Sequence, residues 1–238
     1  MAINVDTVYK TVLSILNKEQ RGYVTPSEFN KVAAQVQLEV FNSYFDDLSQ
    51  LNKSVQVDID YANKIDLLDE KLAIFKTSST FSGTYTGGIF PLPLSVSELG
   101  TVIYNEIELQ RVQRTELYNL NKSPYTAPSV SYPIYLYENG NLIVYPNTIT
   151  SGISLNYVRK PVDPIWGFTV GTRGQYIYDS GNYVPGIPST GSRSFELHEK
   201  EQTTVILKIL MYSGVIIQNP QIVQMAAQQV QEENANSK

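Results

Sequence analysis

The sequence predicts an α+β fold in which helices at both ends of the chain bracket a β-rich middle. Near the N-terminus, and again after residue 195, apolar residues recur at the spacing of helices. Between residues 77 and 194, Gly, Ser, Thr, Tyr and Pro become frequent, and apolar residues alternate with polar ones as in strands. Because one core must serve both ends, we expect the terminal helices to pack together and the middle to project as an insertion.

Residues 1–76 are expected to form an N-terminal helical scaffold. A first helix is predicted from Asn4 to Asn17. The second helix has the clearest start, because Thr25 can cap it, Pro26 suits the first helical position and Glu28 can complete a capping box. Its apolar residues keep helical spacing as far as Leu51, so it should be a long helix that faces the core.

The rest of this scaffold is less regular. Residues 53–59 alternate in polarity, which predicts a strand or an extended connector, and residues 66–75 suggest a short helix.

The β-rich insertion is assigned to residues 77–194. Its strongest signal is a hairpin over residues 134–145, where two alternating apolar runs flank Asn139-Gly140, the preferred pair for a two-residue turn. A strand over 153–158 follows, and a second hairpin is predicted over 176–184. Upstream, residues 102–112 read as a strand and 116–120 as a helical turn.

A scaffold helix is predicted over residues 195–214, with Ser194 as its cap and Gly214 as its end. Residues 215–238 then form a C-terminal extension, in which Asn219 and Pro220 restart a helix. This Gln-rich helix could be a disordered end, could fold back on its own domain, or could dock as an arm on another protein. We favour the arm, and its candidate docking residues are Val215, Ile216, Ile217, Pro220, Ile222, Val223, Met225 and Val230.

Seventeen tyrosines allow two interpretations beyond ordinary sheet packing. They could contact a neighbouring subunit, because Tyr is favoured at interfaces, or they could form an aromatic platform for sugar. We favour subunit contact. The segment 167–194 is long for a passive connection, so its Tyr176, Tyr178 and Tyr183 are the candidate inter-subunit contacts.

Composition and motifs argue against catalysis. The chain has no Cys and a single histidine, His198, which excludes disulfides, thiolate chemistry and sites that need two imidazoles. Asp58, Asp60 and Asp69 lack the glycine of a calcium loop, and Glu199 and Glu201 read as solvated charges. We therefore expect no enzyme, cofactor or metal site; a hydrolase with carboxylates from separate strands is the remote alternative.

The formal net charge of −5 argues against a sequence-specific nucleic-acid binder, which usually has a basic face. It is compatible with a channel through which DNA slides without being gripped. The chain has no apolar run of membrane-spanning length, and its start lacks a signal-peptide pattern. We therefore expect no membrane partner and a protein that stays where it is made.

Residues 132–146 (YPIYLYENGNLIVYP), residues 153–161 (ISLNYVRKP) and the ending 195–229 together resemble head-to-tail connector proteins of tailed bacteriophages. The resemblance is strongest to the ring or adaptor proteins of short-tailed crAss-like phages. It implies a virion protein, assembled in the host cytoplasm, that forms a ring of twelve subunits beneath the portal and continues the DNA channel. It also implies that the C-terminal extension docks on the portal and that other tail or ring proteins are neighbours.

A second function, from another class, stays open at this point. A tail-associated carbohydrate-binding module could recognise a receptor through the tyrosine-rich β region.

Overall fold

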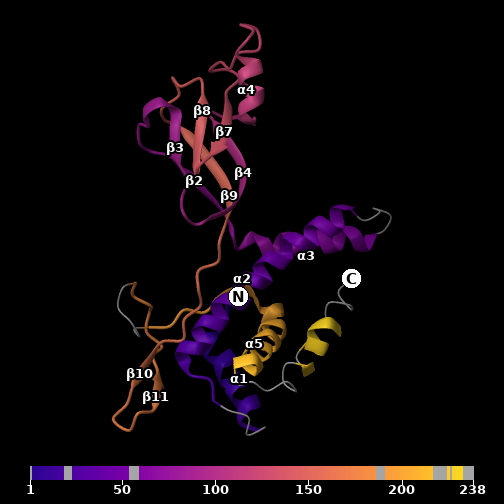
Figure 1. Ribbon diagram of the computed structural model, residues 1–238, viewed down its shortest axis with the longest axis vertical. Coiled ribbons are helices and arrows are strands. Elements are labelled where there is room, and N and C mark those ends of the chain that lie inside the picture. The colour runs from indigo at the N-terminus through magenta and orange to yellow at the C-terminus, as the bar shows by residue number, and fades with distance from the viewer. Residues whose placement is uncertain are drawn as a thin grey trace. The chain divides into compact units, whose positions relative to one another are not determined.

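The computed structural model describes residues 2–18, 23–53, 59–185, 191–216, 224–225 and 227–232. Helices and strands are both present, with helices toward the two ends and strands in the middle, so the predicted α+β class is confirmed. The chain divides into two compact units (Figure 1). We call residues 1–74 with 161–238 the helical unit and residues Phe75–Lys160 the sandwich unit.

The first two helices of the helical unit begin where the sequence predicts. α1 covers Val5–Lys18, and the side-chain oxygen of Asn4 accepts the N–H groups of Asp6 and Thr7 at 2.8 and 3.1 Å. α2 covers Pro26–Lys53 and starts with the expected capping box: the Thr25 N–H donates to the Glu28 carboxylate at 2.9 Å, and the Glu28 N–H donates to the Thr25 hydroxyl at 3.4 Å. The Thr25 hydroxyl also donates to this carboxylate and so lowers the pKa of Glu28.

The third helix of this unit is longer than predicted. α3 covers Ile59–Ala73, whereas the sequence suggested residues 66–75, and most of the predicted strand or connector over 53–59 lies outside the described residues. Lys71 on α3 forms an ion pair with Glu201 at 2.6 Å, in which both side chains are largely buried. Glu201 is therefore not the solvated charge that the sequence suggested.

The helix predicted from Phe195 to Gly214 is wrong at both ends. Phe195–His198 form strand β12, which pairs with β1 (Ala2–Ile3). A short 3₁₀ helix, η2, covers Glu199–Glu201, and α5 covers Gln202–Ile216. Buried Phe195 and Leu197 alternate with partly exposed neighbours, which is the period of a strand. α5 continues past Gly214 to Ile216, so this glycine does not end the helix as predicted.

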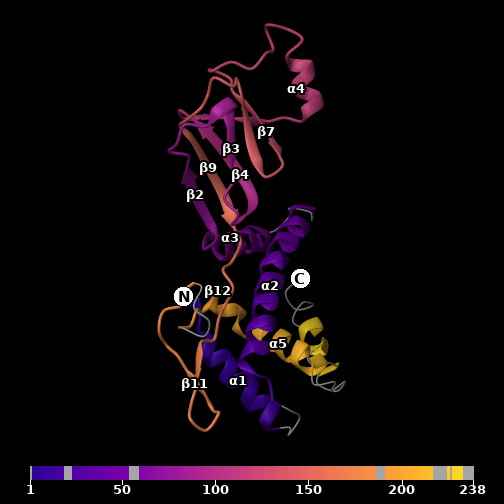
Figure 2. The same ribbon diagram turned by 60° about the vertical axis from the view of Figure 1, so that its left-hand side comes forward.

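The core of the helical unit lies between α1, α2 and α5. α5 contacts both α1 and α2, as expected for the terminal helices (Figure 2). Tyr9 of α1 also packs against Phe29 of α2. The apolar faces of these helices supply the fully buried side chains of this core: Val8, Val12, Leu16, Phe29, Ala33, Val36, Val205 and Ile209.

The chain re-enters the helical unit at Pro161, so residues 161–194 do not belong to the β insertion as predicted. Amide side chains on α2 hold this returning segment. Gln37 donates to the carbonyl of Val162 at 2.8 Å and accepts the N–H of Glu196 at 2.9 Å. Asn30, two turns earlier on the same face, donates to the carbonyl of Trp166 and accepts its N–H, at 3.2 and 2.8 Å. These amides satisfy backbone groups that no strand pairs.

The sandwich unit consists of two four-stranded sheets. The first has the order β2-β9-β4-β5 and the second β3-β8-β7-β6. The bounds of these strands are Lys76–Thr80 (β2), Ile89–Pro91 (β3), Val96–Tyr104 (β4), Ile107–Glu108 (β5), Gln110–Arg111 (β6), Ile134–Glu138 (β7), Asn141–Tyr145 (β8) and Ile153–Arg159 (β9). Side chains from both sheets form one core, with Phe90, Val102, Leu142, Val144, Ile153 and Leu155 at its centre.

The predicted hairpin around Asn139-Gly140 is confirmed. β7 and β8 pair antiparallel, and both turn residues have positive φ, 51° and 70°. Helix α4 (Arg114–Leu120), predicted as a helical turn, adds a second small core of Val112, Leu117, Ile134 and Leu136. Ile134 and Leu136 of β7 face this second core, whereas Tyr135 between them faces the core between the sheets. β7 is therefore buried on both faces.

One other strand prediction is wrong and another is confirmed. The strand predicted over 102–112 is broken, because Asn105 and Glu106 adopt positive φ and turn the chain from β4 into β5. The strand after the hairpin does form, as β9. It pairs with β2 and β4 in the other sheet and not with its chain neighbour β8.

Candidate functional site

The predicted docking residues of the C-terminal extension are only partly described. Val215 and Ile216 complete α5, while Ile217, Pro220, Ile222 and Val223 lie outside the described residues. Residues 224–225 and 227–232 are helical, which agrees with the predicted second helix where the chain is described. In this helix the Met225 side chain is 63 % exposed and Val230 is half-buried.

The second hairpin lies earlier in the chain than predicted. β10 (Phe168–Val170) pairs with β11 (Tyr176–Tyr178), and the turn between them is closed by hydrogen bonds between Gly171 and Gln175 and between Gly174 and Gly171, both 2.9 Å. Residues 179–185, after Tyr178, form a loop. The carboxylate of Asp179 accepts the N–H groups of Gly181 and Gly191 at 2.9 and 3.0 Å and so closes the base of that loop.

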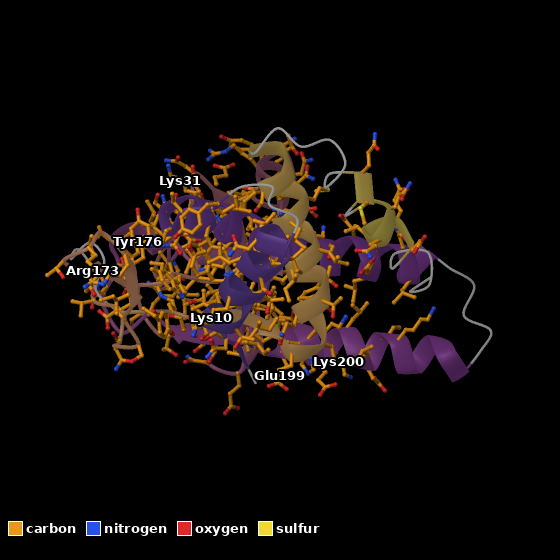
Figure 3. All side chains as sticks on the ribbon, turned by 90° about the horizontal axis from the view of Figure 1, so that it is seen from below. Lys10, Lys31, Arg173, Tyr176, Glu199 and Lys200 are labelled. Atoms are coloured by element: carbon orange, nitrogen blue, oxygen red, sulfur yellow. The ribbon has the colours of Figure 1, made fainter. Side chains whose placement is uncertain are left out.

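The three candidate tyrosines therefore have different surroundings. Tyr176 and Tyr178 lie on one face of the hairpin. Figure 3 shows Tyr176 and Arg173 at the end of the unit that the hairpin occupies. Tyr183 lies in the loop, where the guanidinium of Arg193 sits 4.4 Å from the centre of its ring.

The base of the hairpin is fixed by Trp166, the only tryptophan of the chain. Its indole N–H donates to the carboxylate of Asp6 on α1 at 3.1 Å. Its ring packs against Tyr9 at 4.5 Å and Tyr178 at 5.5 Å between centroids. The hairpin is thus attached to α1 by an aromatic cluster and a hydrogen bond to a charged group.

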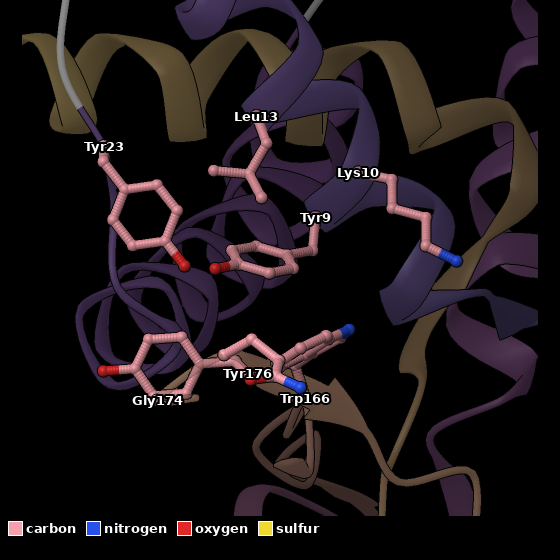
Figure 4. Close-up of a pocket in the computed structure, with 8 residues that line it drawn as sticks. Tyr9, Lys10, Leu13, Tyr23, Trp166, Gly174 and Tyr176 are labelled. Carbon is pink, nitrogen blue, oxygen red and sulfur yellow. The ribbon is translucent and has the colours of Figure 1, made fainter. Parts of the chain in front are cut away.

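An aromatic pocket opens between α1 and this hairpin, with a volume of about 530 Å³ (Figure 4). Tyr176 faces Tyr9 and Tyr23 across it, and Lys10 stands at one side. The residues that line it are Tyr9, Lys10, Leu13, Tyr23, Trp166, Gly174, Gln175 and Tyr176.

The polar groups of the pocket are unequally engaged. The hydroxyl of Tyr9 donates to the carbonyl of Val24 at 3.0 Å and also interacts with the hydroxyl of Tyr23. Burial, followed by this contact with Tyr23, raises the pKa of Tyr9 well above its usual range, so Tyr9 stays neutral. Lys10 is paired with Asp6 at 2.7 Å but keeps its ammonium largely exposed. Tyr23 is 52 % exposed and Tyr176 is 40 % exposed, so both rings can contact a ligand.

Sequence reasoning found only Tyr176 among these residues. Tyr9 was hidden in the apolar stripe of the first helix, and Tyr23 preceded a helix cap. The single tryptophan, Trp166, was the only sequence feature that indicated a binding site here, because tryptophan is enriched at protein interfaces. It could not reveal which helix the ring would meet.

The sandwich unit carries a separate group of exposed tyrosines around the end of α4. Tyr118, Tyr125 and Tyr132 are 62, 99 and 81 % exposed. Hydrogen bonds within the loop fix its course, including the hydroxyl of Thr126 to the carbonyl of Leu120 at 2.8 Å. The rings are therefore displayed on an ordered loop.

The single histidine makes a structural contact in the helical unit. The Nδ1 atom of His198 accepts the N–H of Lys200 at 3.2 Å and so caps the 3₁₀ helix η2. Across the described part of the chain, no three His, Cys, Asp or Glu side chains lie together as a metal site would require. Within the same part, no helix combines the length and the apolar composition needed to cross a bilayer.

No family model matches the chain, and no curated protein matches it.

Proposed function

We propose that this protein is a structural subunit of a phage head-to-tail connector, a homo-oligomeric ring that sits beneath the portal in the virion neck and continues the DNA channel. The observation that supports it best is the display of apolar side chains on the β10–β11 hairpin. Val170, Ile177 and Tyr176 are 63, 49 and 40 % exposed on an element of two three-residue strands.

The exposed apolar side chains of this hairpin would be more stable if another protein surface buried them. A two-stranded hairpin is marginally stable alone in water, and this one is anchored at its base by Trp166. Val170 and Tyr176 point to one face while Ile177 points to the other, so folding of a single copy leaves apolar surface open on both faces. A neighbouring copy that covers this hairpin would make a head-to-tail contact, which closes into a ring when its rotation permits.

The C-terminal extension supplies the contact to the portal in this proposal. Its described helix exposes Met225, a flexible apolar side chain suited to an irregular partner surface, among polar residues. Double-stranded DNA passes through the channel without specific binding, since a subunit with a net charge of −5 offers phosphate little attraction.

Electron microscopy of the purified full-length chain tests the ring directly. The expected result is a closed ring with a single rotational symmetry, twelve-fold if the resemblance to phage connectors holds. A chain that stays monomeric alone and in the presence of the portal protein would contradict the proposal.

Charged substitutions in the β10–β11 hairpin test ring assembly separately from folding. The double variant Val170→Asp, Ile177→Asp should lose the ring and keep the thermal unfolding of the single copy, because both side chains are exposed. Leu94→Asp is the matched control, since Leu94 is a fully exposed apolar residue of the sandwich unit. If the control disrupts the ring as strongly as the double variant, the hairpin is not the assembly element.

Truncation after Ile216, the last residue of α5, tests the arm. The shortened chain should fold and form rings, yet fail to bind the portal. Portal binding at unchanged affinity would remove the docking role from residues 217–238.

The exposed tyrosines of the sandwich unit favour carbohydrate recognition as the second candidate function. Tyr125 and Tyr132 present aromatic rings beside Ser, Thr and Asn side chains on one ordered loop. Binding to a glycan array that is lost in the Tyr125→Ala variant, by a protein that does not form rings, would favour this function over the connector.

A further inference from the structure

Strand β2 forms the least protected sheet edge of the sandwich unit. It ends the order β2-β9-β4-β5, so one of its sides pairs with no strand among the described residues (Figure 2). The other edge strands, β3, β5 and β6, have only two or three residues, and β3 ends in Pro91. Short strands, prolines, bulges and charges are the usual features that keep a sheet edge from pairing with another chain. β2 has five residues, no proline and no bulge against β9, and its one charged residue, Lys76, stands at its first position.

The backbone of β2 presents hydrogen-bonding groups on this open side. In an antiparallel pair only alternate residues bond to the partner strand, and the residues between them direct their N–H and C=O groups the opposite way. The N–H of Phe81 donates to the carbonyl of Ile153 at 2.9 Å, just after the last residue of β2. Counting back from Phe81, Ser79 also bonds to β9. Ser78 and Thr80 therefore direct their N–H and C=O groups away from β9.

The side chains of β2 select the kind of strand that can be added. Those of Thr77 and Ser79 are small and half-buried, and they lie opposite the large Tyr157 and Leu155 of β9. Both of these β9 residues pack in the core between the sheets. A second β2 strand would place small residues opposite small ones and bury little apolar surface. A strand that alternates large apolar residues with polar ones, as β9 does, would extend the core instead.

We infer that the open edge of β2 binds an extended segment of a partner protein as an added strand. The backbone of this segment pairs with Ser78 and Thr80. Its large apolar residues lie beside Thr77 and Ser79, and its polar residues face outward. In this mode of recognition the main-chain hydrogen bonds supply affinity, and the pockets for alternate side chains supply specificity.

This inference goes beyond the connector role and does not depend on it. The proposed ring contact uses the β10–β11 hairpin of the helical unit, whereas β2 belongs to the sandwich unit. A single copy could bind such a segment, and a ring could form with this edge unoccupied. The two proposals can therefore fail separately.

A peptide with the sequence of β9, ISLNYVR, is the probe, because this segment already pairs with β2 and has the required alternation. The peptide carries a fluorescein label and is titrated with the full-length protein. The expected result is a saturable rise in fluorescence anisotropy. The same peptide with proline in place of its asparagine should bind at least about tenfold more weakly, because proline has no N–H to donate.

Two substitutions at one position separate backbone recognition from side-chain recognition. Ser78→Pro removes an N–H that points away from β9, so the pairing of β2 with β9 remains and peptide binding should fall at least about tenfold. Ser78→Ala is the matched control, since it keeps the N–H and should bind like the unaltered protein. Thr80→Pro removes the second N–H of the open side and decides the question if circular dichroism shows that Ser78→Pro is unfolded.

Amide hydrogen exchange measured by NMR gives a readout that does not need a variant. In the unbound protein the N–H groups of Ser78 and Thr80 should exchange faster than those of Thr77 and Ser79, which bond to β9. Saturation with the peptide should slow the exchange of Ser78 and Thr80.

Three results would overturn the inference. One is the absence of a saturable anisotropy change at submillimolar protein. Another is equal peptide binding by Ser78→Pro, Thr80→Pro and the unaltered protein. The third is self-association of the protein alone that Ser78→Pro abolishes, which would assign this edge to a second copy of the chain.

Discussion

The two units complete their cores in opposite ways. The sandwich unit is one continuous segment, and its ends meet: the N–H of Arg159 donates to the carbonyl of Phe75 at 2.9 Å. The helical unit is assembled from both ends of the chain. Its α2 binds backbone groups more than a hundred residues away, at Val162, Trp166 and Glu196. Local sequence can therefore specify the sandwich unit, whereas the helical unit depends on side chains that recognise distant backbone.

The largest expected effect comes from cutting the chain at the unit boundary. A fragment of residues 75–160 should fold cooperatively, because both sheets and their common core lie within it. A fragment of residues 1–74 should not, because α1 and α2 lose the core residues Val205 and Ile209 of α5. Thermal unfolding followed by circular dichroism compares the two. A cooperative transition in the fragment 1–74 would refute this contrast.

Substitutions in the two cores should act on different unfolding transitions. Phe29→Ala in the helical unit should cost about 3–5 kcal/mol and Leu155→Ala in the sandwich unit about 2–5 kcal/mol, since both side chains are fully buried. Trp166 fluorescence reports the helical unit alone. In urea, Phe29→Ala should move the fluorescence midpoint and Leu155→Ala should not. A large shift with Leu155→Ala would show that the two units unfold together.

The anchors on α2 give a smaller effect that is specific to the helical unit. Gln37→Ala leaves the carbonyl of Val162 and the N–H of Glu196 without their partner and should cost about 2–4 kcal/mol. The matched control is Gln35→Ala, which removes an exposed amide from the same helix and should have little effect on stability. The free energy of unfolding from urea titrations measures both. Equal losses would mean that the Gln37 hydrogen bonds add nothing to stability.

Features governed by neighbours in the chain could be predicted from the sequence. The capping box of Thr25 and Glu28 and the hairpin turn at Asn139-Gly140 are local, because turn and cap geometry depend on a few consecutive residues. The α+β class follows from such segments.

Features that depend on contacts with residues far away in the chain could not be predicted from the sequence. Phe195–His198 read as the start of a helix because apolar residues continue into α5, yet pairing with Ala2–Ile3 makes them a strand. The aromatic pocket could not be predicted for the same reason, since its residues Tyr9, Tyr23 and Tyr176 come from three separate segments. Their sequence positions carry no sign of their convergence.

The smallest expected effect concerns one half-buried carboxylate in each unit. Backbone N–H groups of Gly191 and Gly181 lower the pKa of Asp179 in the helical unit. Hydrogen bonds from the Arg114 guanidinium, including one from Nε at 2.9 Å, lower the pKa of Glu138 in the sandwich unit. For both, the stabilisation is complete above the unfolded pKa, roughly 4, and is lost as the pH falls through the lower folded pKa.

Salt should distinguish the two carboxylates. The Arg114–Glu138 pair is an exposed ion pair, so raising the salt to about 1 M, where the Debye length is about 3 Å, should bring the pKa of Glu138 back toward its ordinary value. The pKa of Asp179 should move less, because its partners are backbone dipoles in hydrogen-bond contact. Titration of the side-chain carboxyl carbons by NMR at low and high salt measures both values. A larger salt-dependent pKa shift for Asp179 than for Glu138 would contradict this prediction. It would mean that the Asp179 carboxylate is held by a charged group and the Glu138 carboxylate is not.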